Sequence, residues 1–152
     1  MRDKIRIGVI GGSNPTERAK TLAYEVGKLI ARAGAILVCG GLGGVMEAAA
    51  KGAKEEGGFT IGILPGKDRD SANPYIDLPV ATNIGYLRNA MVVLNSDVVI
   101  AVDGSYGTLS EIAYAMIYGI KVIGLETWDV EGVEVANSPS EAVEKAFKVI
   151  RR

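Results

Sequence analysis

Short apolar runs alternate along the chain with longer segments in which apolar residues recur at helical spacing. Each run has the length of one strand and is apolar at nearly every position, as in strands covered on both faces. The predicted strands span about residues 5–10, 35–39, 59–64, 79–82, 97–102 and 121–125. The predicted helices span about residues 16–33, 44–56, 85–95, 107–118 and 139–151. The alternation predicts an α/β fold, a Rossmann-like doubly wound parallel sheet of about six or seven strands with helices on both faces.

The length and charge of the chain limit the classes of protein to which it can belong. Its 152 residues have the size of one domain and contain no repeat or low-complexity tract, so we expect residues 1–152 to form a single domain. Seventeen basic and eighteen acidic residues give a net charge of -1, which provides no overall field for nucleic acid or an anionic membrane. No apolar run approaches the roughly 20 residues of a membrane span. We therefore expect a cytoplasmic protein that binds neither nucleic acid nor membrane.

The sequence contains no histidine. The commonest general base near neutral pH and the commonest metal ligand are therefore missing, which argues against a Ser-His-Asp hydrolase and against a zinc enzyme. We expect no bound metal, and any catalysis must depend on carboxylates. The single cysteine, Cys39, ends a predicted strand and is expected to be a small buried residue rather than a nucleophile.

Three glycine-rich turns follow predicted strands, and in a parallel sheet such turns lie along the edge where ligands bind. They are Gly11-Gly12-Ser13, then Gly40-Gly41-Leu42-Gly43-Gly44 with Met46 behind it, and Asp103-Gly104-Ser105-Tyr106-Gly107-Thr108. Glycine lets the backbone approach a ligand closely, and the free amide groups at a helix start attract anions. The three turns together predict one phosphate-binding site. The alternative is that these glycines serve only tight turns and close packing.

The common nucleotide-binding motifs are absent from these turns. Gly8, Gly11 and Gly12 do not have the Gly-x-Gly-x-x-Gly spacing, and Cys39 followed by glycines stands where a ribose-binding acid is expected. NAD is therefore disfavoured. The chain also lacks a Gly-x-x-x-x-Gly-Lys-Ser/Thr motif, which argues against a Walker-type ATPase.

Two charged residues fall at the same edge of the predicted sheet. The Glu111 carboxylate follows the third turn and can act on a bound ligand, or Thr108 and Glu111 can form a capping box that satisfies free amide groups at the helix start. Arg88 lies near the start of the helix over residues 85–95. Its guanidinium can pair with Glu111, bind a phosphate or remain an ordinary solvated group.

Two further segments have structural and functional interpretations. Asn14-Pro15-Thr16-Glu17 predicts a helix start, with Asn or Ser as the cap and Pro inside the helix, and its alternative role is ligand contact. The long irregular segment over residues 65–78 contains Lys67 and Arg69. It is either a binding loop that closes on an anion or a solvated surface loop.

At these motifs the chain resembles the LONELY GUY and lysine-decarboxylase-like (SLOG) superfamily, and more closely its molybdenum cofactor carrier protein-like branch. The resemblance extends over nearly the full length and rests on residues 7–12, 40–46, 61–66, 88–89 and 106–111. In the phosphoribohydrolase branch, the glycine-Thr motif holds the phosphate of a nucleoside monophosphate, and an Arg and a Glu act in cleaving the N-glycosidic bond. By position, the resemblance implies these roles for Thr108, Arg88 and Glu111.

The sequence departs from the hydrolase pattern in two places. The usual Pro-Gly-Gly reads Asp103-Gly104-Ser105, and the usual Arg-Lys pair reads Arg88-Asn89. The carrier-like branch tolerates such variation, and the resemblance to it implies binding without turnover. The pyridoxal phosphate chemistry of a lysine decarboxylase is rejected, because no lysine stands in a recognisable Schiff-base context.

Three hypotheses about function follow. The first is a binder or carrier of a phosphorylated nucleotide-like ligand, either a nucleoside monophosphate or the molybdenum cofactor, with no cofactor required for activity. The second is a nucleoside 5'-monophosphate phosphoribohydrolase, with Arg88 and Glu111 as catalytic residues. The third is an oligomeric assembly module without a small ligand. The resemblance implies a homodimer or higher oligomer. The expected ligand-binding residues are Gly11, Gly12, Ser13, Gly40, Gly41, Gly43, Gly44, Met46, Arg88, Asn89, Gly104, Ser105, Tyr106, Gly107, Thr108 and Glu111.

Overall fold

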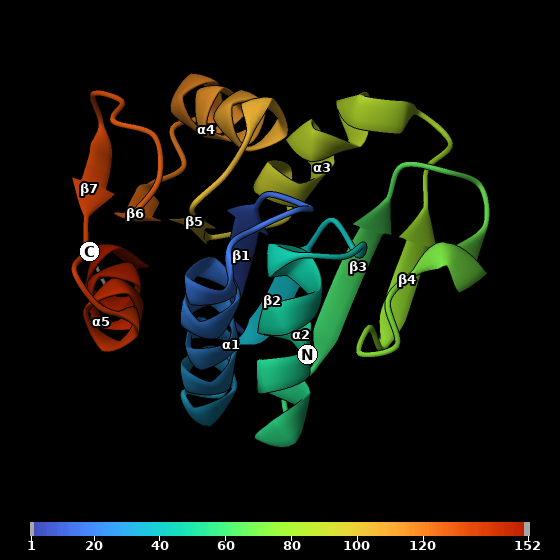
Figure 1. Ribbon diagram of the computed structural model, residues 1–152, viewed down its shortest axis with the longest axis horizontal. Coiled ribbons are helices and arrows are strands. Elements are labelled where there is room, and N and C mark those ends of the chain that lie inside the picture. The colour runs from blue at the N-terminus through green and yellow to red at the C-terminus, as the bar shows by residue number, and fades with distance from the viewer. Residues whose placement is uncertain (1, 151–152) are drawn as a thin grey trace.

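A seven-stranded parallel sheet forms the centre of the molecule, as Figure 1 shows for the computed structural model, which describes residues 2–150. The strand order is β4-β3-β2-β1-β5-β6-β7, and every neighbouring pair is parallel. The strands are β1 (Arg6–Gly11), β2 (Ile36–Cys39), β3 (Thr60–Leu64), β4 (Leu78–Ala81), β5 (Val98–Val102), β6 (Val122–Leu125) and β7 (Val133–Val135). The predicted α/β fold with a doubly wound parallel sheet is confirmed.

Helices cover both faces of the sheet (Figure 1). They are α1 (Glu17–Arg32), α2 (Val45–Glu55), α3 (Arg88–Leu94), α4 (Tyr106–Tyr118) and α5 (Pro139–Ile150), with 3-10 turns η1 (Arg69–Ser71) and η2 (Gly85–Leu87). One apolar core lies between the sheet and α1, α2 and α5, and a second core lies between the sheet and α3 and α4. None of the described helices is long and apolar enough to cross a membrane.

The predicted elements agree with the structure except at two places. The short strand β7 was not predicted, because it lies at the sheet edge and contains Glu134 between two valines that are not fully buried. The predicted helix over residues 85–95 is divided into η2 and α3. Residue 151, where the last helix was expected to end, lies outside the described residues.

The helix cap was predicted correctly from the sequence for α5 but not for α1. The Ser138 hydroxyl oxygen accepts from the Glu141 amide at 3.1 Å, and Pro139 occupies the first helical position of α5, as expected. The helix α1 starts within one residue of its expected start, but the expected cap, Asn or Ser with Pro15 inside the helix, is wrong. The Thr16 hydroxyl oxygen is the cap and accepts from the Ala19 amide at 3.1 Å, so Pro15 lies outside the helix.

Glycines bring α1 and α2 into close contact beneath the glycine-rich edge. A Cβ atom on Gly27 would lie 1.9 Å from the Ala49 carbonyl oxygen, and one on Gly52 would lie 2.1 Å from the Tyr24 carbonyl oxygen. Neither helix can accept a side chain there without moving apart. This contact fixes the positions at which the first two glycine-rich turns enter their helices.

Candidate functional site

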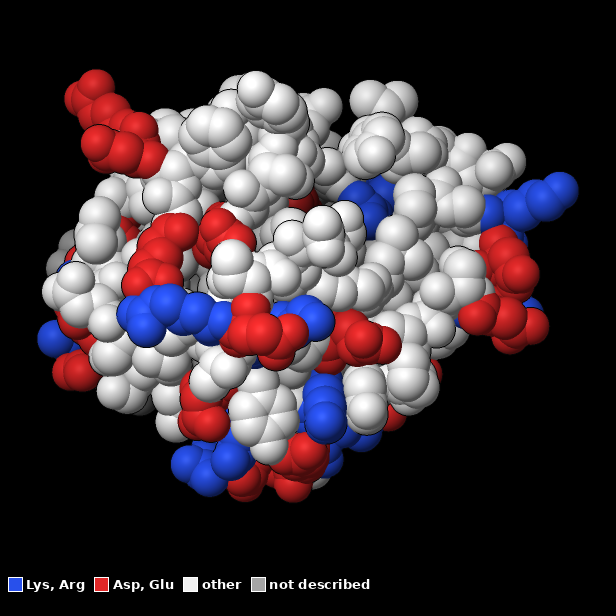
Figure 2. All heavy atoms as spheres, in the orientation of Figure 1, with Lys and Arg blue, Asp and Glu red and all other residues white. Residues whose placement is uncertain are grey.

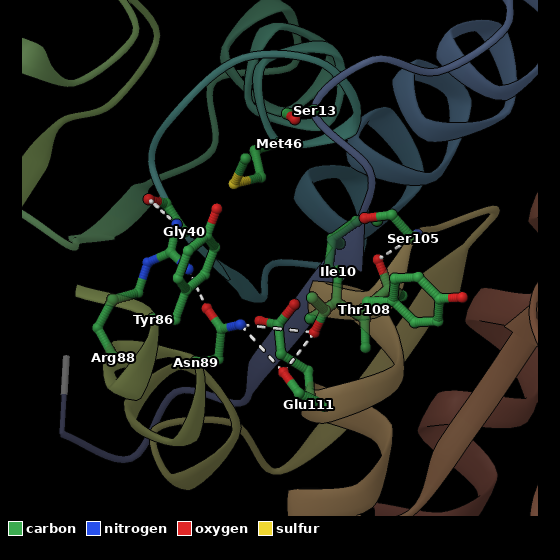
Figure 3. A pocket seen from close by; sticks show the side chains of 15 residues that line it. Ile10, Ser13, Gly40, Met46, Tyr86, Arg88, Asn89, Ser105, Thr108 and Glu111 are labelled. Carbon is green, nitrogen blue, oxygen red and sulfur yellow. Dashed lines mark hydrogen bonds between the residues drawn. The ribbon is translucent and has the colours of Figure 1, made fainter.

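A pocket of about 470 Å³ opens where the carboxyl ends of β1 and β2 meet α3 and α4 (Figure 3). The predicted ligand-binding residues that line it are Gly11, Ser13, Gly40, Met46, Arg88, Asn89, Ser105, Tyr106, Gly107, Thr108 and Glu111. Gly12, Gly41, Gly43, Gly44 and Gly104 do not line it, and the prediction missed Val9, Ile10, Tyr86 and Ser110. The pocket volume is within the range of small-molecule sites.

The third glycine-rich turn forms the start of α4. Ser105 is the residue before the helix, and its amide donates to the Thr108 hydroxyl oxygen at 3.3 Å. The predicted capping box between Thr108 and Glu111 is therefore wrong, because Thr108 pairs backward with Ser105 instead. Since the first amide groups of a helix have no acceptor within it, those of Tyr106 and Gly107 are available to an anion in the pocket.

Close packing explains some of the glycines at this edge. A Cβ atom on Gly11 would lie 2.5 Å from the Val102 carbonyl oxygen, and one on Gly40 would lie 2.8 Å from Nη2 of Arg88. Gly104 has a φ of 133°, and its Cβ would lie 2.5 Å from the Thr108 side chain. Gly11 and Gly104 are required by the fold itself, whereas Gly40 makes room for the Arg88 and Met46 side chains that line the pocket.

Packing does not explain Gly12, Gly43 and Gly107. A Cβ atom on Gly43 would meet no heavy atom within 4 Å, and one on Gly107 would meet only Nδ2 of Asn89, at 3.7 Å. The nearest atom to a Cβ on Gly12 is the Gly104 Cα, at 3.8 Å. Close packing therefore does not account for these three glycines, of which Gly107 lines the pocket.

Arg88 and Glu111 are both buried, with 7% of each residue exposed, so Arg88 is not an ordinary solvated side chain. Nε of Arg88 donates to the Ile63 carbonyl oxygen at 2.9 Å, and Nη2 donates to the Gly40 carbonyl oxygen at 3.4 Å. Among the described residues, Arg88 forms no ion pair with Glu111. The guanidinium is therefore fixed in the pocket wall by backbone oxygens.

Burial controls the ionisation of the pocket. It raises the pKa of the Glu111 carboxyl to about 8, although the nearby charge of Arg88 acts in the opposite direction. Burial also lowers the pKa of Arg88, against the charge of Glu111, but a guanidinium stays protonated at neutral pH. At pH 7 the Glu111 carboxyl is mostly neutral, so the pocket lining carries a net positive charge that favours an anionic ligand.

Two tyrosines form the mouth of the pocket. Tyr86 of η2 is 86% exposed and Tyr106 of α4 is 81% exposed, although both line the cavity. The Tyr106 ring centroid lies 5.9 Å from that of Trp128. Lys67 and Arg69 are absent from the described lining, so the segment over residues 65–78 supplies no cation to the pocket.

Cys39 is buried beneath the pocket, as predicted. Burial raises the pKa of its thiol to about 12, so it is not a nucleophile at neutral pH. Among residues 2–150 no group of three or more acidic or cysteine side chains is arranged to hold a metal ion.

Comparison with known proteins agrees with this architecture. Residues 4–150 match the sequence profile of the SLOG cluster4 family. The chain belongs to the SLOG cluster4 family. It is 39% identical to the molybdenum cofactor binding protein from the phototrophic bacterium Rippkaea orientalis, with a TM-score of 0.93 and 99% of each chain covered.

Two further relatives extend this similarity. The molybdenum cofactor carrier protein from Chlamydomonas reinhardtii is 34% identical, with a TM-score of 0.89 and coverage of 98% of this SLOG chain and 99% of that chain. An uncharacterised protein from Archaeoglobus fulgidus is 49% identical over 140 residues, which cover 91% of this chain and 92% of the relative. The resemblance to the carrier-like branch of the SLOG superfamily is therefore confirmed.

Proposed function

We propose that this SLOG protein is a carrier that binds the molybdenum cofactor, a phosphorylated pterin, in the pocket between β1, β2, α3 and α4. The observation that carries the proposal is a buried cation beside a helix start whose glycine, Gly107, is not required for packing. The similarity to molybdenum cofactor binding and carrier proteins over nearly the whole chain supports the same function.

The phosphate of the ligand would lie at the start of α4. The amide groups of Tyr106 and Gly107 are available there, and the Ser105 and Ser13 side chains also line this part of the pocket. Amide groups at a helix start bind phosphate through hydrogen bonds and through the helix dipole. The fixed guanidinium of Arg88 adds the positive charge that the rest of the lining lacks.

The ring system would lie in the less polar part of the pocket. Val9 and Ile10 of β1 and Met46 of α2 line this part, and Tyr86 closes its outer side. Apolar and aromatic walls with a few polar groups are typical of sites for flat heterocycles. Met46 suits such a wall because its flexible, polarisable side chain adapts to the shape of a ring.

The single carboxyl in the pocket lining supports binding without turnover. Glycoside cleavage commonly requires two carboxyl groups, one of them ionised, and Glu111 is the only acidic residue of the described lining. At pH 7 its carboxyl is mostly protonated. The chain therefore lacks an ionised general base in the pocket at neutral pH.

Anaerobic mixing with purified molybdenum cofactor tests the proposal. After gel filtration, we expect molybdenum and pterin fluorescence to elute with the protein in equal molar amounts. Excess inorganic phosphate should weaken binding, because it competes for the start of α4. Absence of binding to the cofactor would overturn the carrier proposal, and absence of binding to every nucleoside monophosphate as well would remove a phosphorylated ligand from this pocket.

The phosphoribohydrolase remains a second candidate, because the structure brings Arg88 and Glu111 into the same pocket as the glycine-Thr motif. Long incubation with nucleoside monophosphates, followed by chromatography, distinguishes the two functions. Free base and ribose 5-phosphate released by the wild type but not by Glu111→Ala would establish hydrolysis. Intact nucleotides in both samples would favour the carrier.

We also propose that the protein forms a homo-oligomer through the outer face of α3 and α4. Exposed apolar residues cover this face, which appears white over these helices in Figure 2: Ile84, Tyr86, Leu87, Met91, Leu94, Tyr106, Met116, Ile117 and Tyr118. The only charged residues within α3 and α4, Arg88 and Glu111, are buried.

A second copy of the chain suits this face better than a charged partner. An uncharged face pairs most favourably with another uncharged face, and α1, α2 and α5 all present charged side chains. Tyr86 and Tyr106 belong both to this face and to the pocket mouth, so a partner there would cover the ligand. We further propose a cytoplasmic location, with which one unpaired cysteine agrees.

A further inference from the structure

The carboxyl group of Glu111 has no polar partner among the described residues, although the residue is buried. It comes from α4 and lies in the wall of the pocket opposite α3 (Figure 3). No described side-chain oxygen is both fully buried and without a partner, so the carboxyl oxygens of Glu111 are open to the pocket rather than sealed in the core. A ligand in the pocket can supply the missing donors.

The hydrogen bonds that the neighbouring side chains form go to oxygens other than those of Glu111. Arg88 donates through Nε to Ile63, through Nη2 to Gly40 and through Nη1 to Asn89. Nδ2 of Asn89 donates to the Gly107 carbonyl oxygen at 3.4 Å and to the Ser110 hydroxyl oxygen at 3.1 Å. The side chains beside Glu111 therefore face other oxygens, and the carboxyl stays open toward the pocket.

Glu111 is placed to contact the end of a ligand that lies farthest from the ligand's phosphate. The Cα atom of Glu111 lies five residues after that of Tyr106, about 7.5 Å further along the helix axis, and its side chain leans back from there toward the helix start. A sugar or a fused ring can occupy this interval between a phosphate at the start of α4 and a group at Glu111. Val9 and Ile10 line the same part of the cavity and can contact the faces of a flat ring.

A carboxylate accepts two parallel N–H bonds when the donors stand side by side. The 2-aminopyrimidin-4-one ring offers this pattern, because its ring N–H is next to an exocyclic amino group. Pterins and guanine share this ring edge. Adenine places an acceptor nitrogen beside its amino group, so it cannot satisfy both oxygens of a carboxylate.

We propose that Glu111 is the residue that selects the ligand, by accepting the paired N–H groups of a 2-aminopyrimidin-4-one edge. The inference rests on the proposed function, since it assigns the chemistry of the group at the inner end of the same pocket. It places pterin phosphates and guanosine monophosphate among the ligands and disfavours adenosine monophosphate.

Recognition in this form requires the ionised carboxyl. The titratable groups that surround it are Arg88 of α3, Cys39 of β2, and Tyr86 and Tyr106 at the mouth. Because burial holds the pKa of free Glu111 at about 8, ligand binding must release a proton at lower pH. The preference for guanine over adenine therefore increases as the pH rises from 6 to 8.

Calorimetric titration with guanosine and adenosine monophosphate tests the inference, because the two ligands carry the same ribose and phosphate. In the wild type at pH 8 we expect guanosine monophosphate to bind at least about tenfold more tightly, with a smaller ratio at pH 6. In Glu111→Gln the ratio should fall at least about tenfold and lose its dependence on pH. The comparison at two pH values in the wild type does not depend on how well the variant folds.

The experiments distinguish failure of this inference from failure of the proposed function. Equal binding of the two nucleotides by the wild type, or equal losses for both in Glu111→Gln, would overturn the selection by Glu111. Binding of the molybdenum cofactor without any binding of guanosine monophosphate would also overturn it and leave the carrier function intact. Failure of the cofactor and of every nucleotide to bind would instead remove the proposed function.

Discussion

Asn89 donates from Nδ2 to the hydroxyl oxygen of Ser110 at 3.1 Å, and this bond joins α3 to α4 at the base of the pocket. Asn89 also accepts from Nη1 of Arg88 and donates to the Gly107 carbonyl oxygen. One buried amide thus positions the guanidinium relative to the first turn of α4. The lysine that the hydrolase pattern has at this position could not accept from Arg88, because an ammonium group has no acceptor.

Replacement of Asn89 by alanine should lower the free energy of unfolding by about 2 kcal/mol, because it leaves buried donors without acceptors. Urea denaturation monitored by circular dichroism measures the change. Asn95→Ala is a control in the same segment, since Asn95 is less buried and its Nδ2 donates only to the Met91 carbonyl oxygen, at 2.8 Å. An equal loss of unfolding free energy in the two variants would show that the hydrogen bonds of Asn89 do not stabilise the fold more than those of Asn95.

Gly107→Ala should leave the fold intact and impair binding. The new Cβ would meet only Nδ2 of Asn89, at 3.7 Å, and alanine is favoured over glycine in a helix by up to about 1 kcal/mol. The methyl group would occupy pocket space, so affinity for the phosphorylated ligand should fall at least about tenfold. Thermal melts and calorimetry report the two effects separately.

Gly66→Ala is the matched control for this glycine. A Cβ on Gly66 would meet no heavy atom within 4 Å, and Gly66 does not line the pocket. Its ligand affinity should remain that of the wild type. Unchanged binding in Gly107→Ala would show that the ligand does not approach the start of α4.

Stability should depend on pH through Glu111. The pKa of its carboxyl is raised from 4.5 to about 8 in the folded protein, so its contribution to stability is complete below pH 4.5 and is lost as the pH rises through 8. Relative to Glu111→Gln, the wild type should lose up to about 5 kcal/mol of unfolding free energy across this interval. Denaturant titrations at pH 5 and pH 8 measure the difference.

The exposed carboxyl of Glu131 provides the reference for this pH effect. Glu131→Gln should follow the wild type at both pH values, because an exposed side chain keeps similar surroundings in the folded and unfolded chain. A wild-type protein that kept the same stability relative to Glu111→Gln at pH 5 and pH 8 would show that Glu111 is not desolvated.

Introduction of a charge at Ile117 should dissociate the proposed oligomer. Ile117 of α4 is 72% exposed in the centre of an uncharged face, and an aspartate there would have to be buried by a partner. Light scattering should give a monomer mass for Ile117→Asp and a larger mass for the wild type. Val135→Asp, at a position 63% exposed on β7, should keep the wild-type mass.

Most of the fold could be predicted from sequence because six strands are apolar runs, and all of them except β4 at the sheet edge are largely buried. Val98–Val102 of β5 is buried at every residue, and no polar position interrupts its pattern. β7 gave no such signal because its three residues are only partly covered. The cap of α4 was assigned incorrectly because Ser105 with Thr108 and Thr108 with Glu111 have the same spacing, and only the structure distinguishes them.

The edge that holds the pocket could also be predicted, because glycines cluster after β1, β2 and β5. The place of Tyr86 in the pocket lining could not be predicted from sequence. A lone aromatic residue before a helix has no pattern that distinguishes a pocket wall from an interface. Val9 and Ile10 lie in a predicted strand, and in the structure they belong to the core as well as to the pocket lining. Sequence likewise could not show that Arg88 is held by the Ile63 carbonyl oxygen, because that contact joins segments 25 residues apart.

The strand order has a consequence for the synthesis of the protein. Strands β1 to β4 occupy one half of the sheet, and α3 then connects β4 to β5, which lies on the other side of β1. The pocket therefore has walls from both halves of the sheet. A nascent chain that ends before α4 has the first two glycine-rich turns but no helix start to receive a phosphate. The pocket is therefore complete only after α4 with Glu111 has been synthesised, and a shorter nascent chain lacks the site that we propose for the ligand.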